Sequence, residues 1–324
     1  MDIAHTPVLP EETLYYLSGG LISQGVETGE NELFVDGTLG EGGHTELFLS
    51  RFPNLRVIGI DADNAIVSVA RKRLTRFGER VVFHTGWADD FFRFYPKDSG
   101  LLKPGIILLD LGVSLFHYEK GDRGFSFRLD ESLDMRIDTT KDMPASDLLA
   151  SLTEEELVSI LFRNAEERYA RRIARAITQA RETSAINNSG ALAEIVYNAV
   201  PVFVRHAKTH PATKTFQALR IAVNGELDRL PALLAAAFSA LKIGGRLGVI
   251  SFHSLEDRIV KNFFRDAARD CICPPSAPVC VCRGRRLGRL ITPKPVSASE
   301  AELIRNPPSR SAKLRVIEKV YEDE

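Results

Sequence analysis

A glycine-rich segment in the first part of the chain has the residue types that let a backbone approach a ligand. It reads DGTLGEGGH from Asp36 to His44 and directly follows a short apolar run. Glycines have no Cβ atom, so the main chain of such a turn can come close to a bound molecule. Tight packing without any ligand is the structural alternative. The sequence therefore predicts a strand-to-helix turn that is suited to binding.

Two acidic residues follow apolar runs where chemistry is expected. Asp61 ends the second run, where a carboxylate can accept both hydroxyl hydrogens of an adenosine ribose. NAD and S-adenosylmethionine both carry that ribose. The glycine spacing G-x-x-G-x-G-G departs from the G-x-G-x-x-G pattern that faces a pyrophosphate, which favours S-adenosylmethionine. Asp110 ends the fourth run and is our candidate for the reacting centre, with a loop-bracing aspartate as the alternative.

Alternating strands and helices must position these residues. Apolar runs predict strands, and helical spacing of apolar residues predicts helices between them. Strands that are apolar throughout are typical of a parallel sheet covered on both faces, with ligands beyond the carboxyl ends of the strands. We expect a doubly wound, mainly parallel sheet. The predicted strands are Leu33–Val35, Val57–Ile60, Val81–Phe83 and Ile106–Leu109, and the predicted helices are Thr45–Phe52 and Ala65–Phe77.

The middle of the chain has a different pattern. From about Glu119 to His210 it shows charged amphipathic helices and no convincing strand, so we predict an inserted helical domain at 118–211. The core is then discontinuous, at 1–117 and 212–324. Core elements predicted after the insertion are a helix at Pro231–Leu241, strands at Arg246–Ser251 and Leu314–Val320, and an irregular, mobile surface loop at Cys271–Ser309.

Composition limits the classes of protein. The chain has 324 residues, 44% hydrophobic and 26% charged, as in ordinary globular proteins. It has no apolar run of the roughly 20 residues that span a bilayer, and its start lacks the features of a secretory signal. We expect a cytoplasmic protein with no membrane partner. The net charge of -1 requires any polyanion to be held by a local basic face.

Several long blocks resemble one known family. The sequence is similar to the bacterial small-subunit ribosomal RNA cytosine-N4-methyltransferases (RsmH/MraW) over nearly its whole length. The blocks are HTPVLPEE at 5–12, VDGTLGEGGHT at 35–45, GIILLDLGVS at 105–114, RGFSFR at 123–128, LDMRID at 133–138, HPATKTFQALRIAVNGEL at 210–227, GGRLGVISFHSLEDRIVK at 244–261 and NPPSRSAKLRVIEK at 306–319.

The resemblance implies a Rossmann-like S-adenosylmethionine-dependent methyltransferase core with an inserted helical substrate domain. It implies methyl transfer to the exocyclic N4 amino group of a cytosine in 16S ribosomal RNA, near the decoding centre. Asp110 is then catalytic, and no metal is expected. The cofactor-binding residues implied are Gly42, Gly43, His44, Asp61, Asp110 and His117, the last as an adenine-side contact.

Some features stay open at this stage. The family often has a phenylalanine after the third strand, where either Trp87 or Phe91 is a candidate to pack on adenine. The chain also lacks the Asn/Asp-Pro-Pro-Tyr motif of many amino methyltransferases and has no Pro-Cys after the fourth strand, as carbon-5 methylation would require. The position of the target nucleotide, the assembly stage of the substrate and the oligomeric state, with a dimer as one alternative, also stay open.

Two sets of side chains are candidates for further roles. The four cysteines form two Cys-x-Cys pairs, and this spacing is shorter than is usual for zinc ligands. Exposed thiols are therefore the alternative to a metal site. The arginines are candidates for RNA contacts, with solvated helix faces as the alternative. The cysteines are Cys271, Cys273, Cys280 and Cys282, and the arginines are Arg163, Arg168, Arg171, Arg172, Arg175, Arg181, Arg283, Arg285, Arg286 and Arg289.

Three other functional hypotheses compete with the cytosine-N4-methyltransferase. They are a methyltransferase that acts on another nucleic acid or on protein, a dinucleotide-dependent oxidoreductase, and an RNA-binding assembly factor without a cofactor.

Overall fold

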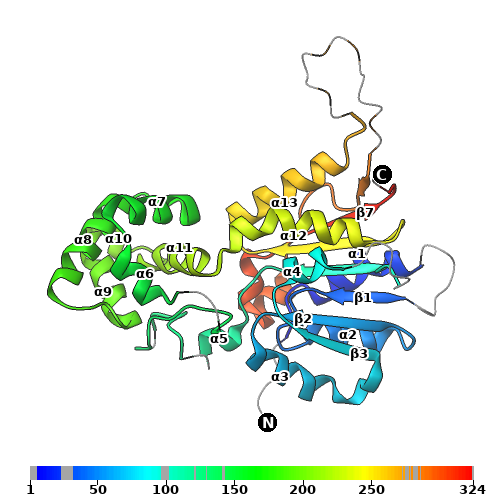
Figure 1. Ribbon diagram of the computed structural model, residues 1–324, viewed down its shortest axis with the longest axis horizontal. Coiled ribbons are helices and arrows are strands. Elements are labelled where there is room, and N and C mark those ends of the chain that lie inside the picture. Colours follow the sequence, from blue (N-terminus) through cyan, green and yellow to red (C-terminus); the bar gives the residue numbers. More distant parts are fainter. Residues whose placement is uncertain are drawn as a thin grey trace. The chain divides into compact units, whose positions relative to one another are not determined.

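The computed structural model describes residues 6–22, 32–95, 102–119, 122–128, 130–140, 143–271 and 286–322, with residues 273, 277, 279 and 284. The chain divides into two compact units, which we call the sheet unit and the helical unit (Figure 1). The sheet unit comprises Met1–Gly112 and Arg229–Glu324, and the helical unit comprises Val113–Asp228.

The sheet unit is built on a seven-stranded sheet in the order β3-β2-β1-β4-β5-β7-β6. The first five strands in the chain are parallel, and β7 pairs antiparallel with both β5 and β6. β1 lies between β2 and β4, so the strand order reverses there, and ligands of such sheets bind at this point. The strands are β1 (Leu33–Asp36), β2 (Arg56–Asp61), β3 (Val81–Thr85), β4 (Ile106–Asp110), β5 (Arg246–Ser251), β6 (Gly288–Leu290) and β7 (Lys313–Lys319).

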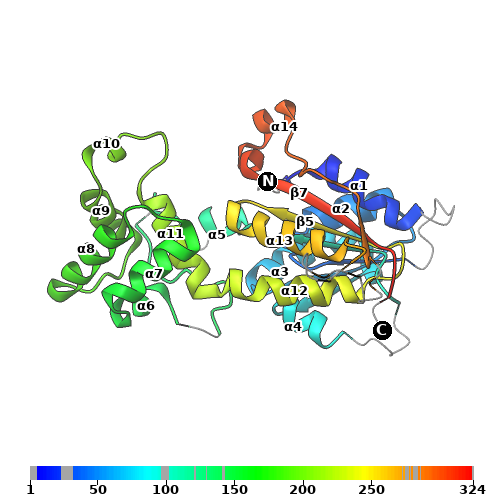
Figure 2. The ribbon, with the colours of Figure 1, turned by 90° about the horizontal axis from the view of Figure 1, so that it is seen from above.

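Helices cover both faces of the sheet (Figure 2). Side chains from α1, α2 and α3 pack on one face, and side chains from α4, α12 and α13 pack on the other. The five parallel strands and the helices on both faces confirm the predicted doubly wound, mainly parallel sheet. The helices are α1 (Pro10–Ile22), α2 (Gly43–Arg51), α3 (Asn64–Leu74), α4 (Ala88–Arg93), α12 (Glu226–Ala240), α13 (Ser254–Ala267) and α14 (Glu300–Arg305), with 3-10 helices η1 (Thr75–Arg80) and η2 (Pro307–Ser311).

The helical unit has its own apolar core, which α6, α7, α8, α9 and α11 share. A capping box of Thr153 and Glu156 starts α7. In the described part of this unit the β-structure is limited to an isolated bridge between Ser132 and Asn188. The helices are α5 (Leu115–Glu119), α6 (Ala145–Ser151), α7 (Glu154–Ala165), α8 (Ala170–Thr183), α9 (Ser189–Ala199), α10 (Val202–Arg205) and α11 (Ala212–Asn224).

Two expectations for the later part of the chain were wrong in detail. α12 begins at Glu226 and contains Pro231, instead of starting at that proline, because Gly225 in the left-handed conformation (φ 63°) ends α11 and a new helix begins at once. The segment Cys271–Ser309 is not irregular throughout. It contains β6 and α14, and β6 is stabilised by pairing with β7.

Candidate active site

The glycine turn between β1 and α2 has a backbone that is open at one position and packed at two others. Gly40 has a φ of 52°, and no atom of the described residues lies within 4 Å of where its Cβ would be. A Cβ on Gly42 (φ 82°) would lie 2.9 Å from Leu74, and one on Gly43 would lie 3.1 Å from Pro7. Gly42 and Gly43 therefore shape the turn, and Gly40 offers the backbone that a ligand can approach.

Asp61, at the end of β2, holds this turn in place. Its Oδ2 accepts a hydrogen bond from the Gly40 amide at 2.9 Å, and its Oδ1 accepts one from the Asp63 amide at 2.9 Å. Each carboxylate oxygen has two lone pairs and can accept more than one hydrogen bond, so a carboxylate at this position is also suited to the hydroxyl hydrogens of a ribose. Asp61 and the open backbone at Gly40 thus form one acceptor site at the edge of the sheet.

Asp110, at the end of β4, lies beside the same turn. Its Oδ2 is 3.8 Å from His44 Nε2, its Oδ1 accepts a hydrogen bond from the Gly112 amide at 3.3 Å, and its own amide donates to Thr38 Oγ1 at 2.6 Å. Burial raises the pKa of Asp110 to about 7, and the nearby carboxylates add to the rise. Near neutral pH this carboxyl is therefore divided between its protonated and ionised forms.

His44 is a neutral partner of Asp110. Burial lowers the pKa of His44 to about 4, and the charge of Arg73 adds to this effect. The pair is therefore not an ion pair at neutral pH, although the two side chains are close. His44 Nε2 is buried and has no hydrogen-bond partner among the described residues, and Nδ1 lies 3.4 Å from Thr13 Oγ1. A buried polar atom of this kind is suited to a contact with a ligand.

A third acidic residue, Asp36, ends β1 beneath the turn. Its Oδ2 accepts a hydrogen bond from Thr45 Oγ1 at 2.7 Å, and its Oδ1 has no partner among the described residues. Burial raises the pKa of Asp36 to about 6. Asp36, Thr38 and Gly40 were not among the predicted site residues, although all three belong to the glycine-rich segment Asp36–His44.

The N-terminal segment closes over the turn and is held by residues from the end of the chain. Pro7 packs on Gly43, and the Asn306 side-chain amide donates to the carbonyls of Thr6 (3.4 Å) and Pro7 (3.3 Å). The Leu9 amide donates to Glu302 Oε1 at 2.7 Å. We call this set of bonds the terminal clamp. It explains why blocks from both ends of the chain matter to the site.

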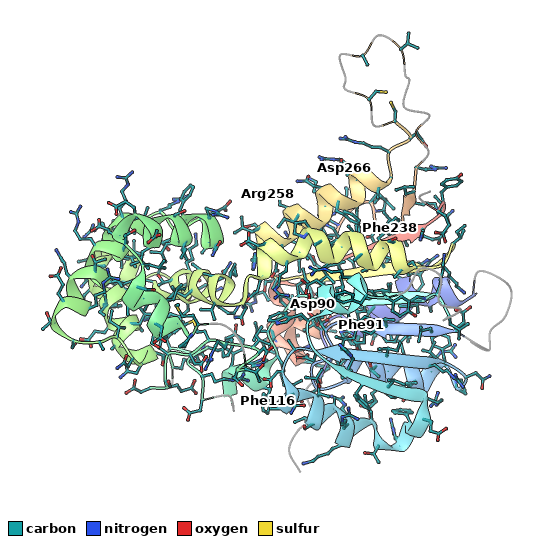
Figure 3. All side chains as sticks on the ribbon, viewed as in Figure 1. Asp90, Phe91, Phe116, Phe238, Arg258 and Asp266 are labelled. Atoms are coloured by element: carbon teal, nitrogen blue, oxygen red, sulfur yellow. The ribbon has the colours of Figure 1, made fainter. Side chains whose placement is uncertain are left out.

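The two candidates for an adenine contact have different surroundings. Trp87 precedes α4 at the carboxyl end of β3, and the Arg229 guanidinium lies 4.6 Å from its ring. Phe91 comes from α4 and lies beside the sheet (Figure 3), with its ring 5.1 Å from His84 and 5.5 Å from Tyr95. Trp87 is at the edge where the ligand is expected, but the choice between the two stays open.

His117 belongs to the helical unit, whereas the other predicted cofactor residues belong to the sheet unit. It lies on α5 and is 3% exposed, with its ring 5.0 Å from Phe125. The structure therefore brings Gly42, Gly43, His44, Asp61 and Asp110 together, and the contact of His117 with a cofactor stays a prediction.

Several of the candidate arginines have structural partners. Arg181 donates to the carbonyls of Leu149 and Leu152 at 2.6 Å, and Arg289 pairs with Glu318 at 2.6 Å. The longer pairs are Arg163 with Asp228, Arg175 with Glu154 and Arg286 with Asp270. Arg168, Arg171 and Arg172 are exposed, and Arg283 and Arg285 lie outside the described residues.

The metal alternative rests partly on residues that the structure does not describe. Cys271 is exposed and Cys273 is half-buried, whereas Cys280 and Cys282 lie outside the described residues. In the described part of the chain no three His, Cys, Asp or Glu side chains are grouped as metal ligands. None of the described helices combines the length and the apolar character needed to cross a membrane.

The residues at the sheet edge fit an adenosine-containing methyl donor. The open backbone at Gly40, the acceptor Asp61 beside it and the buried, unpartnered His44 Nε2 supply the polar atoms that such a molecule requires. The strand order with an antiparallel β7, together with acidic residues at the ends of β1, β2 and β4, defines an α/β protein of the Rossmann-like nucleoside-binding class.

Comparison with known proteins gives the family. The profile of the MraW methylase family matches residues 2–320, and the chain belongs to this family. The ribosomal RNA small subunit methyltransferase H of Treponema denticola is 53% identical over 99% of this chain and 98% of that protein. The protein of the same name from Treponema pallidum is 45% identical over 98% of this chain and 93% of that protein.

Solved structures were compared as well. An rRNA methylase from Streptococcus thermophilus aligns with a TM-score of 0.37 and 11% identity, over 96% of this chain and 95% of that one.

Proposed function

We propose that this protein transfers the methyl group of S-adenosylmethionine to the N4 amino group of a cytosine in 16S ribosomal RNA, near the decoding centre. Both Treponema relatives are named as methyltransferases of small-subunit ribosomal RNA, and we extend that activity to this chain. The observation that carries the proposal is the position of Asp110, a carboxyl at the end of β4 whose Oδ2 lies 3.8 Å from Nε2 of His44 in the glycine turn. We place the reaction in the cytoplasm.

Asp110 supports the reaction as a hydrogen-bond acceptor. S-adenosylmethionine supplies an electrophilic methyl group on a sulfonium sulfur. The cytosine amino nitrogen is a weak nucleophile because its lone pair is delocalised into the ring. An ionised Asp110 would hold an N–H of this group and orient the nitrogen. As the new C–N bond forms, the bond between the methyl group and the sulfur breaks and leaves a neutral thioether, and Asp110 would take up the proton that the nitrogen loses. A pKa near 7 suits this role at neutral pH.

The other residues at the sheet edge bind and orient. Asp61 and the Gly40 backbone would hold the ribose, with Gly42 and Gly43 fixing the shape of the turn. His44 is neutral and buried, so it places no positive charge beside the sulfonium group or Asp110. The helical unit, which contains the predicted inserted domain at 118–211, serves as the part that recognises RNA.

The test is mass spectrometry of nucleosides from small-subunit ribosomal RNA. Cells that lack the gene should lose one N4-methylated cytidine, and wild-type protein should restore it. Persistence of that nucleoside in the deletion strain would reject the substrate. Complementation with Asp110→Ala should fail, and normal turnover with unchanged S-adenosylmethionine affinity would reject the role of this residue.

Calorimetry separates the competing classes. The purified protein should bind S-adenosylmethionine and not NAD. Uptake of NAD instead would favour the oxidoreductase, and RNA binding without uptake of either molecule would favour an assembly factor.

A further inference from the structure

Two aromatic rings on the helical unit lie nearly parallel to the ring of His210. The His210 ring is 4.6 Å from Phe127 with an angle of 24° between the planes, and 6.1 Å from Tyr197 with an angle of 21°. Phe216 supports Phe127 edge-on at 5.3 Å, and the Arg205 guanidinium lies 5.2 Å from the Tyr197 ring. Flat, partly exposed rings of this kind are the surfaces on which unpaired nucleic-acid bases stack.

The rings of Phe127 and His210 border a pocket that is open to solvent. Phe127, Arg128, Lys208, Thr209, His210 and Thr213 line it. Arg128, Lys208, Thr209 and His210 are exposed. The pocket thus combines aromatic walls with a guanidinium, an ammonium and two hydroxyl groups, and the whole set belongs to one compact unit.

The charge of this segment favours an anion. Residues 195–225 include four lysines and arginines and two histidines, but no aspartate or glutamate. Among the described residues neither Arg128 nor Lys208 has an acidic partner, although Asp130 is close to Arg128 in the chain. Two unpaired cations beside stacked rings match the phosphate and base of a nucleotide better than a neutral or basic ligand.

We infer that this pocket binds a nucleotide of single-stranded RNA, with the base stacked on His210 and Phe127 and the flanking phosphates held by Arg128 and Lys208. The inference rests on the proposed function for the identity of the RNA as substrate. It adds a second point of contact, on the helical unit, for a nucleotide other than the one that reacts. Partial desolvation lowers the pKa of His210, which favours the neutral form of the ring.

The phosphate contacts are tested by salt dependence. Binding of the full-length protein to a fluorescein-labelled single-stranded RNA is followed by anisotropy at several salt concentrations. Arg128→Gln and Lys208→Gln should each weaken binding and lower the slope of log Kd against log salt by about 0.7. Lys72→Gln, which removes an exposed lysine on α3 of the sheet unit, is the matched control and should leave the slope unchanged.

The stacking contact is tested by two changes at His210. Its Nδ1 accepts a hydrogen bond from the Ala212 amide at 3.2 Å, so the ring also has a local structural role. His210→Asn retains an acceptor but loses the ring, and it should weaken RNA binding about tenfold. His210→Phe loses the acceptor but retains the flat face, and it should bind RNA like the wild type. The opposite order would assign the residue to the local structure alone.

The outcomes separate this inference from the proposed function. Wild-type affinity and slope in both charge variants, or an equal loss in Lys72→Gln, would overturn the pocket. The same holds if the wild-type protein does not bind the RNA. Methyl transfer by the wild type to unmodified small subunits tests the proposed function separately, because it is measured without any pocket variant. Should the His210 variants fail to fold, the variants of the exposed Arg128 and Lys208 still decide the question.

Discussion

Replacing Asp110 by asparagine should make the protein more stable and less active, and the gain in stability should depend on pH. The pKa of this carboxyl is raised from 3.8 to about 7 in the folded protein. Between pH 3.8 and about pH 7 the folded protein therefore keeps a proton on Asp110 that the unfolded chain has lost. Consequently, Asp110 lowers stability progressively as the pH rises from about 4 to about 7, and the loss is complete above that range.

The size of the effect follows from the shift. A change of about three pKa units corresponds to about 4 kcal/mol at pH 8 and to about 1.5 kcal/mol at pH 5. The asparagine amide has its own desolvation cost at this site, where the side chain is 20% exposed, so we expect a net gain of roughly 2 kcal/mol at pH 8. The shift already includes the repulsion between Asp110 and Asp36, which the substitution removes.

The assay uses the single tryptophan of the chain. Trp87 lies in the sheet unit, so its fluorescence reports the unfolding of that unit in urea. Wild type and Asp110→Asn are compared at pH 5 and pH 8, with methyl transfer measured on the same samples. An equal change in stability at both pH values would show that the carboxyl is not perturbed by burial. A destabilised variant at pH 8 would refute the reasoning outright.

Three further predictions concern the same edge of the sheet. Methyl transfer by the wild type should rise about tenfold between pH 6 and pH 8, because the ionised form of Asp110 accepts the hydrogen bond and its pKa is about 7; a flat profile of kcat against pH would exclude this role. Gly42→Ala should lower the free energy of unfolding by about 1–2 kcal/mol, since φ is 82° and the new methyl group would overlap a leucine, and urea unfolding without a loss would contradict that strain. Of Trp87→Leu and Phe91→Leu, the variant that removes the adenine contact should lose about tenfold in S-adenosylmethionine affinity by calorimetry, and equal affinities would show that neither ring stacks.

The parallel strands could be located from sequence because their apolar residues are continuous. The predicted run Val57–Ile60 lies within β2, and Ile106–Leu109 lies within β4. Since ligands bind beyond the carboxyl ends of such strands, the acidic residues that follow them, Asp61 and Asp110, could be identified as well.

Other parts of the site depend on contacts between distant residues and leave no local pattern. β6 has three residues and forms only by pairing with β7, so its sequence reads as loop. Nothing near Thr38 indicates that its hydroxyl accepts a hydrogen bond from the Asp110 amide. The openness of Gly40, compared with the packed Gly42, depends on which side chains of later elements face each glycine.

The terminal clamp has a consequence for how the enzyme is made. Leu9 and Glu302 are 293 positions apart, and the hydrogen bond between them can form only after nearly the whole chain has left the ribosome. β7, which lies between β5 and β6, is also synthesised last. A nascent chain or a product of premature termination therefore lacks the complete site around the glycine turn. Only a fully translated copy can begin to modify the particles on which translation depends.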